Sequence, residues 1–266
     1  MNVYDRERVQ LRGQPLAALP DDLRHASSLR HLDVSCTGLT RLPDWLWSLR
    51  QLETLNLAEN AIGSISEAIG SLQQLRMLDL GHNQLSSLPA ALGALAALSD
   101  YLYLSDNQLT SLPPALGGLT RLKYLGFTHN LLTELPEDIG NLASLRELRL
   151  YNNRLARLPS AIGRLGQLRE LHLHDNQLVE LPDSIGSLGA LRSLDLRNNR
   201  LEQLPPQIGQ LPNLGFIDLR ANRLRRLPGS LAELPRLERL DLRWNPLESV
   251  PSWVEALEGR GCAVLL

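Results

Sequence analysis

The sequence predicts an α/β solenoid, curved so that a parallel β-sheet lines the concave side and 3₁₀, extended and short helical segments form the convex side. Asparagines recur at a nearly constant spacing, each preceded by an LxL pair and followed by an LP step and an IGxL segment. Hydrophobic residues make up 43% of the 266-residue chain but aromatic residues only 4%, so leucine fills most of the core. A core built from one repeated aliphatic residue favours a repeated structural unit.

The spacing of the asparagines defines the repeat. From Asn60 to Asn245 every step is 23 residues, except the step from Asn83 to Asn107, which is 24 residues. The general form is LxxLxLxxNxLxxLPxxIGxLxx. A single unit of this length cannot bury its own leucines, but stacked units bury one continuous core.

Each part of this pattern has a structural reason. The LxL pair alternates with period two, which predicts a short strand with both leucines on one face. The asparagine follows where the chain turns, and its amide can satisfy backbone groups of the turn and of neighbouring repeats. The LP step ends the strand and favours an extended or 3₁₀ return path, and IGxL brings two further apolar residues back to the core. Strands of successive repeats are therefore expected to pair in parallel.

The whole chain can be assigned to this pattern. We predict an N-terminal cap with a degenerate first repeat in residues 1–28, ten repeats in residues 29–259, and a C-terminal cap in residues 260–266. One of the ten repeats has 24 residues and the others have 23. The segment 252–259 predicts a short amphipathic helix, and the last residues predict a strand-like cap. No residues remain for a linker or a second domain.

The LPxxIGxL pattern resembles the intracellular, 23-residue class of leucine-rich repeats found in Ras-group repeat proteins of plants, in Scribble- and Erbin-like scaffolds, and in many bacterial repeat proteins. The resemblance covers essentially the whole chain. It implies a leucine-rich-repeat horseshoe and a protein-binding role, often through the concave sheet. The kinase, ligase or PDZ module that accompanies some members of the class has no counterpart in this sequence.

Charge and cysteine content exclude several functions. The net charge of −2 and the pI of about 6.3 do not favour nucleic-acid binding, which usually needs a strongly basic surface. Cys36 and Cys262 lie near opposite ends of the chain, so a disulfide between them is not expected, which fits a reducing compartment. The polar N-terminus has no apolar stretch of signal-peptide type, and no apolar run reaches the length of a membrane span, so we expect neither a signal peptide nor a membrane anchor. We expect a cytoplasmic protein, with secretion by a non-classical route left open.

Tyrosines gather on the predicted concave face. The outward positions are the residues before, between and after the two leucines of LxL, and four of the five tyrosines occupy them. Tyrosine and arginine are enriched at binding hot spots, and we favour partner binding because exposed aromatic side chains here have no core to fill. The alternative is that the rings simply stack on one another. The candidate residues in this group are Tyr101, Tyr103, Tyr124, Arg149, Tyr151, His172 and His174.

The 24-residue repeat carries its extra residue just before the strand that contains Tyr101 and Tyr103. The insertion could form a bulge that changes the direction of these two side chains, since bulges are often placed beside functional sites. A tolerated insertion explains the sequence equally well.

A column of arginines accompanies a column of aspartates in the later repeats. Arg197, Arg220 and Arg243 each follow an aspartate by two residues, which places both side chains of a pair on one face of the sheet. We favour a ladder of internal ion pairs, although exposed pairs add little stability. The alternative is a strip that binds an acidic partner. Trp244 follows Arg243 directly, which makes a cation–π contact plausible.

Metal and catalytic sites are not expected. Glu170, His172 and His174 have residue types that bind zinc, but positions on a flat parallel sheet seldom converge on one ion, so we predict no metal site. The sequence has no nucleotide-binding loop, metalloprotease helix or nucleophile elbow. Cys36 has no obvious base beside it and is expected to be a free thiol. We therefore predict no catalytic residues and no cofactor.

The favoured function is that of a scaffold or adaptor that binds a protein partner on the concave face. Three alternatives stay open: a bacterial effector that acts on host proteins, an enzyme with an unrecognised site, and self-association.

Overall fold

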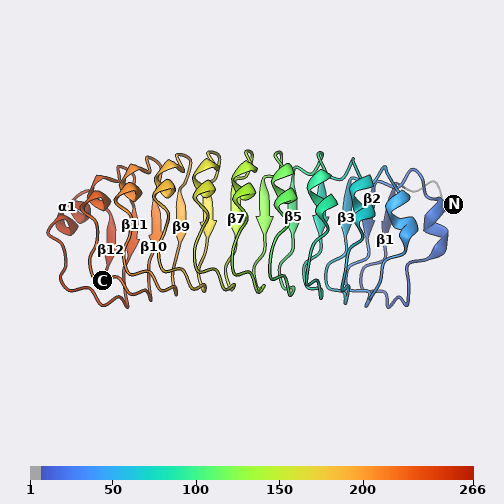
Figure 1. Ribbon diagram of the computed structural model, residues 1–266, viewed down its shortest axis with the longest axis horizontal. Helices are drawn as coiled ribbons and strands as arrows, with labels where there is room; N and C mark the ends of the chain where they lie inside the picture. Colours follow the sequence, from blue (N-terminus) through green and yellow to red (C-terminus); the bar gives the residue numbers. More distant parts are fainter. Residues whose placement is uncertain (1–6) are drawn as a thin grey trace. The chain divides into compact units, whose positions relative to one another are not determined.

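The computed structural model describes residues 7–266 of the chain. These residues form two compact units, the first ending at Leu131 and the second running from Leu132 to Leu266. Both units are built from the same alternation of a three-residue strand and a five-residue 3₁₀ helix (Figure 1). Each unit is described by itself.

In the first unit, each strand pairs in parallel with the next, with equivalent positions of successive repeats side by side. The strands are β1 (Arg8–Gln10), β2 (His31–Asp33), β3 (Thr54–Asn56), β4 (Met77–Asp79), β5 (Tyr101–Tyr103) and β6 (Tyr124–Gly126). The 3₁₀ helices between them are η2 (Asp21–His25), η3 (Asp44–Ser48), η4 (Glu67–Ser71), η5 (Ala90–Ala94) and η6 (Pro114–Gly118).

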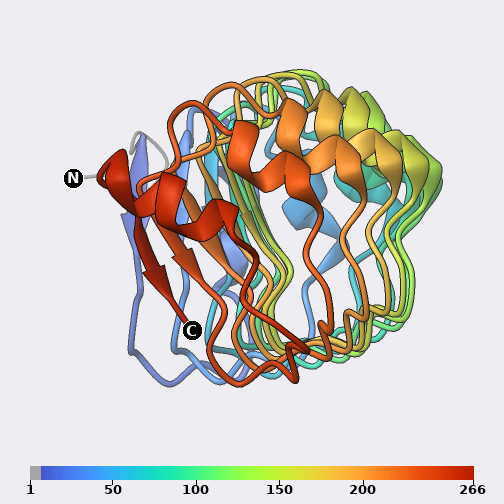
Figure 2. The same cartoon turned by 90° about the vertical axis from the view of Figure 1, so that its left-hand side faces the viewer.

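The second unit continues the same pattern and ends in an α-helix and a final strand. Its strands are β7 (Glu147–Arg149), β8 (Glu170–His172), β9 (Ser193–Asp195), β10 (Phe216–Asp218), β11 (Arg239–Asp241) and β12 (Ala263–Leu265), each parallel to the next. Its helices are η7 (Glu137–Asn141), η8 (Ser160–Arg164), η9 (Asp183–Ser187), η10 (Pro206–Gln210), η11 (Gly229–Glu233) and α1 (Trp253–Gly259). Figure 2 shows the helices as one row and the strands as another, on a different side of the unit.

The predicted fold class is confirmed, because parallel strands form one side of each unit and 3₁₀ helices another. The helix predicted for residues 252–259 is α1, and the strand-like cap predicted after it is β12. In the N-terminal segment, β1 and η2 have the pattern of a repeat even though Gln14 stands where later repeats have asparagine.

The core is made of the leucines of the repeat. Both leucines of an LxL pair are buried, as Leu148 and Leu150 illustrate with 0% exposure, while the residues around them point away from the core. Burying one such side chain contributes about 1.5 to 3 kcal/mol relative to leaving it in water. The period-two prediction for the strands is therefore confirmed.

The asparagines connect neighbouring repeats through their amides, as predicted. In the second unit, Nδ2 of Asn176 donates to the carbonyl oxygens of Leu150 and Leu173, each at 3.0 Å. Its Oδ1 accepts from the backbone N–H of Leu155, also at 3.0 Å. The side chain is 8% exposed, so these bonds satisfy backbone groups that water does not reach.

The residue before each of these turn positions adopts a left-handed backbone. Ten such residues have φ between 52° and 63°, a region that asparagine, aspartate and histidine tolerate better than most residues. Trp244 is the bulkiest of these ten residues, with a φ of 63°, and it is 71% exposed. The guanidinium carbon of Arg243 lies 5.5 Å from the centre of its ring, which confirms the expected cation–π contact.

The glycine of the IGxL segment allows adjacent 3₁₀ helices to pack closely. A Cβ added at Gly163 would lie 2.4 Å from the carbonyl oxygen of Ser184 in the next helix. Such a distance is a steric clash with backbone, so these helices could not approach as they do with a larger residue. Close approach, rather than a turn, is the reason for glycine at this position.

The extra residue of the 24-residue repeat is accommodated before the strand. The backbone N–H groups of Ser99 and Asp100 both donate to the carbonyl oxygen of Arg76. Strand β5 then pairs with β4 without a shift, Tyr101 beside Met77 and Tyr103 beside Asp79. The insertion therefore does not redirect the two tyrosines relative to the neighbouring strand.

Candidate functional site

The strands of each unit have one face toward the leucine core and one face away from it. We call the second the open face; it carries the first and third residue of each strand and the residue two positions after the strand, while the leucine directly after most strands is buried. These side chains are half-buried or exposed in most strands, with the leucine between them buried. This is the surface that the sequence predicts to be concave and to bind a partner.

Three tyrosines form a cluster on the open face of the first unit. The ring of Tyr103 lies between those of Tyr101 and Tyr124, with 4.7 Å between centroids in both pairs and interplanar angles of 48° and 59°. All three side chains remain half-buried. Burial raises the pKa of Tyr101 above its ordinary value, so its hydroxyl stays protonated. The rings contact one another in tilted pairs rather than in parallel stacks, and they remain partly exposed to solvent.

The second unit carries its own aromatic contact. The ring of Tyr151 stacks on that of His174, with 4.3 Å between centroids and 11° between planes. Nδ1 of His174 lies 2.9 Å from a carboxylate oxygen of Asp195 on the neighbouring strand. Burial alone would raise the pKa of Asp195, but the imidazole of His174 and the backbone N–H and guanidinium of Arg197 outweigh burial and lower that pKa.

The structure divides the predicted tyrosine, arginine and histidine group into two. Tyr101, Tyr103 and Tyr124 belong to the first unit and form one aromatic cluster. The other members belong to the second unit and lie on its open face. They are Arg149, Tyr151, His172 and His174.

The arginine and aspartate columns pair with each other, as the favoured interpretation expects. Arg220 lies 2.5 Å from Asp218, and Arg243 lies 2.7 Å from Asp241. The pair of Arg197 and Asp195 is looser, at 3.9 Å. This pairing explains the two columns without a partner, and partner contact by the three arginines stays a prediction.

Asp241 is the most buried member of the columns, with 1% exposure. It is surrounded by the guanidinium groups of Arg243, Arg239 and Arg220, at 2.7, 3.1 and 3.6 Å. Burial alone would raise the pKa of this carboxyl, but hydrogen bonds from Arg243 and Arg239 hold it at about 2. Arg239 begins β11, two residues before Asp241, and so lies outside the arginine column that the sequence predicts.

A hollow of about 200 Å³ on the open face of the second unit lies beside Phe216, which is 47% exposed. Its lining includes Ser193, the register neighbour of Phe216, together with His172 and Arg239. The small serine beside the large phenylalanine leaves the depression. Pockets for whole small ligands are usually at least about 300 Å³, so this hollow suits one side chain of a larger partner. Phe216 was not among the predicted site residues.

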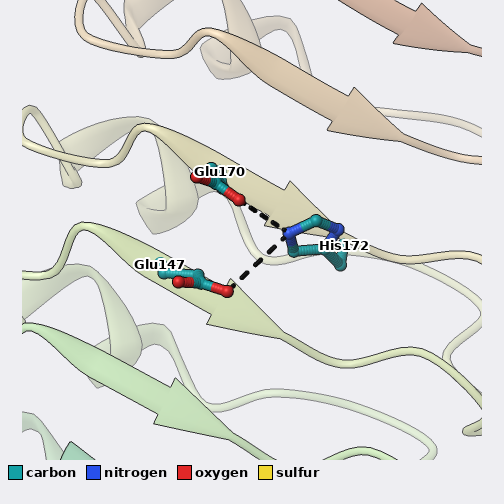
Figure 3. Close-up of side chains that lie close together, drawn as sticks. All are labelled: Glu147, Glu170 and His172. Carbon is teal, nitrogen blue, oxygen red and sulfur yellow. Dashed lines mark hydrogen bonds and ion pairs between the residues drawn. The ribbon is translucent and has the colours of Figure 1, made fainter.

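Two carboxylates and an imidazole converge on strands β7 and β8 (Figure 3). Nε2 of His172 lies 3.2 Å from Oε2 of Glu170 and 3.9 Å from Oε1 of Glu147. The three ligand atoms all lie within 4.8 Å of one another. The sequence suggests Glu170, His172 and His174 as the residues of zinc-binding type. In the structure His174 pairs with Asp195 instead, and Glu147 of the adjacent strand is the third member of the group.

A larger hollow of the second unit lies elsewhere, along the loops that follow the asparagine turns. It has a volume of about 740 Å³ and is lined mainly by charged side chains, among them Glu180, Glu202, Arg223 and Arg225. In the first unit a hollow of about 270 Å³ lies on the open face beside His31 and Met77. Neither combines a hydrophobic lining with convergent polar groups in the way typical of ligand sites.

Cys36 does not have the environment of a nucleophile. Its Sγ donates to a carboxylate oxygen of Glu59 at 2.8 Å, and this hydrogen bond raises the pKa of the thiol. A reactive cysteine needs a lowered pKa. Cys36 and Cys262 are both free thiols.

Three family models of the leucine-rich repeat match the chain. The leucine-rich repeat region model matches residues 114–196. A second leucine-rich repeat model matches residues 60–109 and 189–247, and a third matches residues 28–49 and 100–119. Their overlapping ranges leave no gap between residues 60 and 247. None of the three describes a catalytic family. No curated protein sequence matches the chain.

Two solved structures illustrate the similarity of fold. The structure of PEPR1 with AtPEP1 is similar with 28% identity and a TM-score of 0.74 over 94% of this chain and 40% of that one. A plant peptide hormone receptor, RGFR1 in complex with RGF2, is similar with 25% identity and a TM-score of 0.72 over 98% of this chain and 49% of that one. The chain thus spans less than half the length of either of these two chains. Among the helices of residues 7–266, none combines the length and apolarity of a bilayer span.

Proposed function

Because this chain is a leucine-rich-repeat protein, we propose that it is a non-enzymatic interaction module that binds a segment of a partner protein on its open face. The repeat positions of the fold are used for packing and for the asparagine bonds, so binding chemistry is left to the side chains that point away from the core. The proposal assigns partner contact to these side chains in both units.

The observation that carries the proposal is the tyrosine cluster of the first unit. Tyr101, Tyr103 and Tyr124 place three half-buried rings together on the face of the sheet that points away from the core. A cluster of this kind offers a large, rigid contact area with hydroxyl groups at its edge, which is typical of binding hot spots. Aromatic side chains gathered on an open sheet surface are a common mark of an interaction site.

The open face of the second unit supports the same proposal with different chemistry. The hollow beside Phe216 is of a size to receive one partner side chain, and Arg239 and His172 at its edge supply hydrogen-bond donors. An apolar anchor with polar groups at its rim is the usual composition of a protein interface. The similar structure of a plant peptide hormone receptor, RGFR1 in complex with RGF2, supports a polypeptide as the class of partner.

Within this function we propose a scaffold or adaptor that works in a reducing compartment such as the cytoplasm. The support is that Cys36 and Cys262 are both free thiols. The proposal excludes catalysis as the primary activity, because the open face carries ion pairs and stacked rings rather than an activated nucleophile with its base.

Affinity capture followed by mass spectrometry tests the proposal. Wild-type protein and a variant with Tyr101, Tyr103 and Tyr124 all changed to alanine are compared on lysates of the source organism and of a eukaryotic cell. Trp45→Ala is the control, because Trp45 is a half-buried aromatic residue on η3 of the same unit. We expect one set of proteins to be captured by wild type and the control and lost in the triple variant.

The other outcomes are informative. Equal capture by the triple variant would contradict the assignment to the tyrosine cluster, and loss in Trp45→Ala alone would move the interface to the 3₁₀ side. Capture only from the eukaryotic lysate would favour an effector, and concentration-dependent self-association without capture would favour an assembly of identical chains.

A further inference from the structure

Glu147, Glu170 and His172 bring three potential metal-ligand atoms together, all within 4.8 Å of one another. Glu147 begins β7, and Glu170 and His172 begin and end β8, so the parallel register places the two glutamates side by side. Period-two alternation puts His172 on the same face as both. All three side chains then point into one space on the open face, as Figure 3 shows.

The donor atoms are those that zinc and similar divalent metals bind. Zinc takes imidazole nitrogen and carboxylate oxygen at about 2.0 to 2.2 Å in a tetrahedral arrangement, which sets donor atoms about 3.4 Å apart. The distances from Nε2 of His172 to the carboxylate oxygens, 3.2 and 3.9 Å, are within half an ångström of that separation. The two glutamate oxygens lie within 4.8 Å of each other, so side-chain rotation has to bring them closer for all three atoms to reach one ion.

Charge also suits a divalent ion, with one opposing group. Two carboxylates and a neutral imidazole carry a charge of −2 and would neutralise the metal. The guanidinium of Arg149 opposes it, because its Nε lies 2.5 Å from the same oxygen of Glu147 that faces His172. The Arg149 side chain is 41% exposed, so it can turn toward solvent and release that oxygen.

We propose that Glu147, Glu170 and His172 form a binding site for one zinc ion or a chemically similar divalent metal. Three protein ligands leave the fourth tetrahedral position to water, and Glu170, with 49% of its side chain exposed, leaves the site accessible. The site lies wholly within the second unit and is independent of the tyrosine cluster, so it can exist whether or not the proposed partner binding is correct.

Metal titration of the full chain without an affinity tag tests this proposal. Isothermal titration calorimetry with Zn²⁺ measures affinity and stoichiometry, and visible absorption with Co²⁺ reports tetrahedral coordination. We expect one equivalent to bind, with the ligand-field bands of a tetrahedral site. Loss of an outer hydrogen-bond partner typically weakens metal binding 10- to 100-fold, so His172→Ala, which removes a ligand, should weaken it at least about tenfold, and Glu170→Gln should do likewise.

Two further variants make the result specific. Arg149→Gln should tighten binding, because it removes the competitor for Glu147. His174→Ala should leave the affinity unchanged, because this histidine is on the same face but pairs with Asp195. The proposal is overturned if wild type and His172→Ala bind Zn²⁺ equally, or if His174→Ala causes the loss instead. Circular dichroism without added metal verifies that each variant is folded.

Discussion

The ring of Tyr103 on β5 lies 4.7 Å, between centroids, from the ring of Tyr124 on β6, and the two planes are inclined by 59°. Tilted aromatic pairs at such distances contribute about 0.5 to 1.5 kcal/mol beyond the area that they bury. A double-mutant cycle with Tyr103→Ala and Tyr124→Ala should therefore give a coupling free energy in this range, measured by urea unfolding. A coupling near zero would mean that the rings do not support each other in solution.

The close packing of the 3₁₀ helices predicts opposite outcomes for two glycines of one repeat. Gly163→Ala would place a Cβ 2.4 Å from the carbonyl oxygen of Ser184, whereas a Cβ at Gly166 would have no atom within 4 Å. Overpacking costs about 1 to 3 kcal/mol, so Gly163→Ala should lower the free energy of unfolding by that amount. Gly166→Ala should leave it unchanged or raise it by about 0.5 kcal/mol. Equal effects of the two substitutions in thermal melts would contradict the packing explanation.

Asn176 should be far more important for stability than exposed polar residues of the same unit. Asn176→Ala removes the bonds to Leu150, Leu173 and Leu155 and leaves buried backbone groups unsatisfied. Each such group costs about 1 to 3 kcal/mol, so we expect a loss of about 3 kcal/mol or more in urea unfolding. Arg200→Ala, at an exposed position after the next asparagine, should change stability by less than about 0.5 kcal/mol. A small effect at Asn176 would show that water replaces the amide.

The ion pairs of Asp241 predict a pH-dependent contribution to stability. The pKa of its carboxyl is about 2 in the folded protein, below the value near 3.9 of an unfolded chain. The folded state therefore favours the charged form, and this stabilisation, of about 2 kcal/mol, is fully present above about pH 5 and is lost as the pH falls toward 2.

Asp241→Asn lacks this titration. Urea unfolding of wild type and Asp241→Asn should therefore differ by about 2 kcal/mol at pH 7, and the difference should shrink as the pH is lowered to 2. A difference that stays constant, or that grows toward acid pH, would contradict the low pKa of this carboxyl.

The repeat pattern was sufficient to predict the strands, the 3₁₀ side and the residues of the open face, because each of these depends on local spacing. The pairing of Arg243 with Asp241 was predictable for the same reason, since both lie on one strand. The convergence of Glu147 with His172 was not, because it depends on side-chain rotamers of two neighbouring strands. The hollow beside Phe216 was missed because it arises from a small residue, Ser193, in a different repeat.

The central claim is that a partner protein contacts the open face of the first unit, and photo-crosslinking tests it most directly. A benzoylphenylalanine is placed at Ser105, which follows β5 on the open face, or at Ser48, which ends η3 on the 3₁₀ side. Both positions leave the three tyrosines intact. We expect the partner found by affinity capture to be crosslinked from position 105 and not from position 48. Crosslinks from position 48 alone would contradict the account.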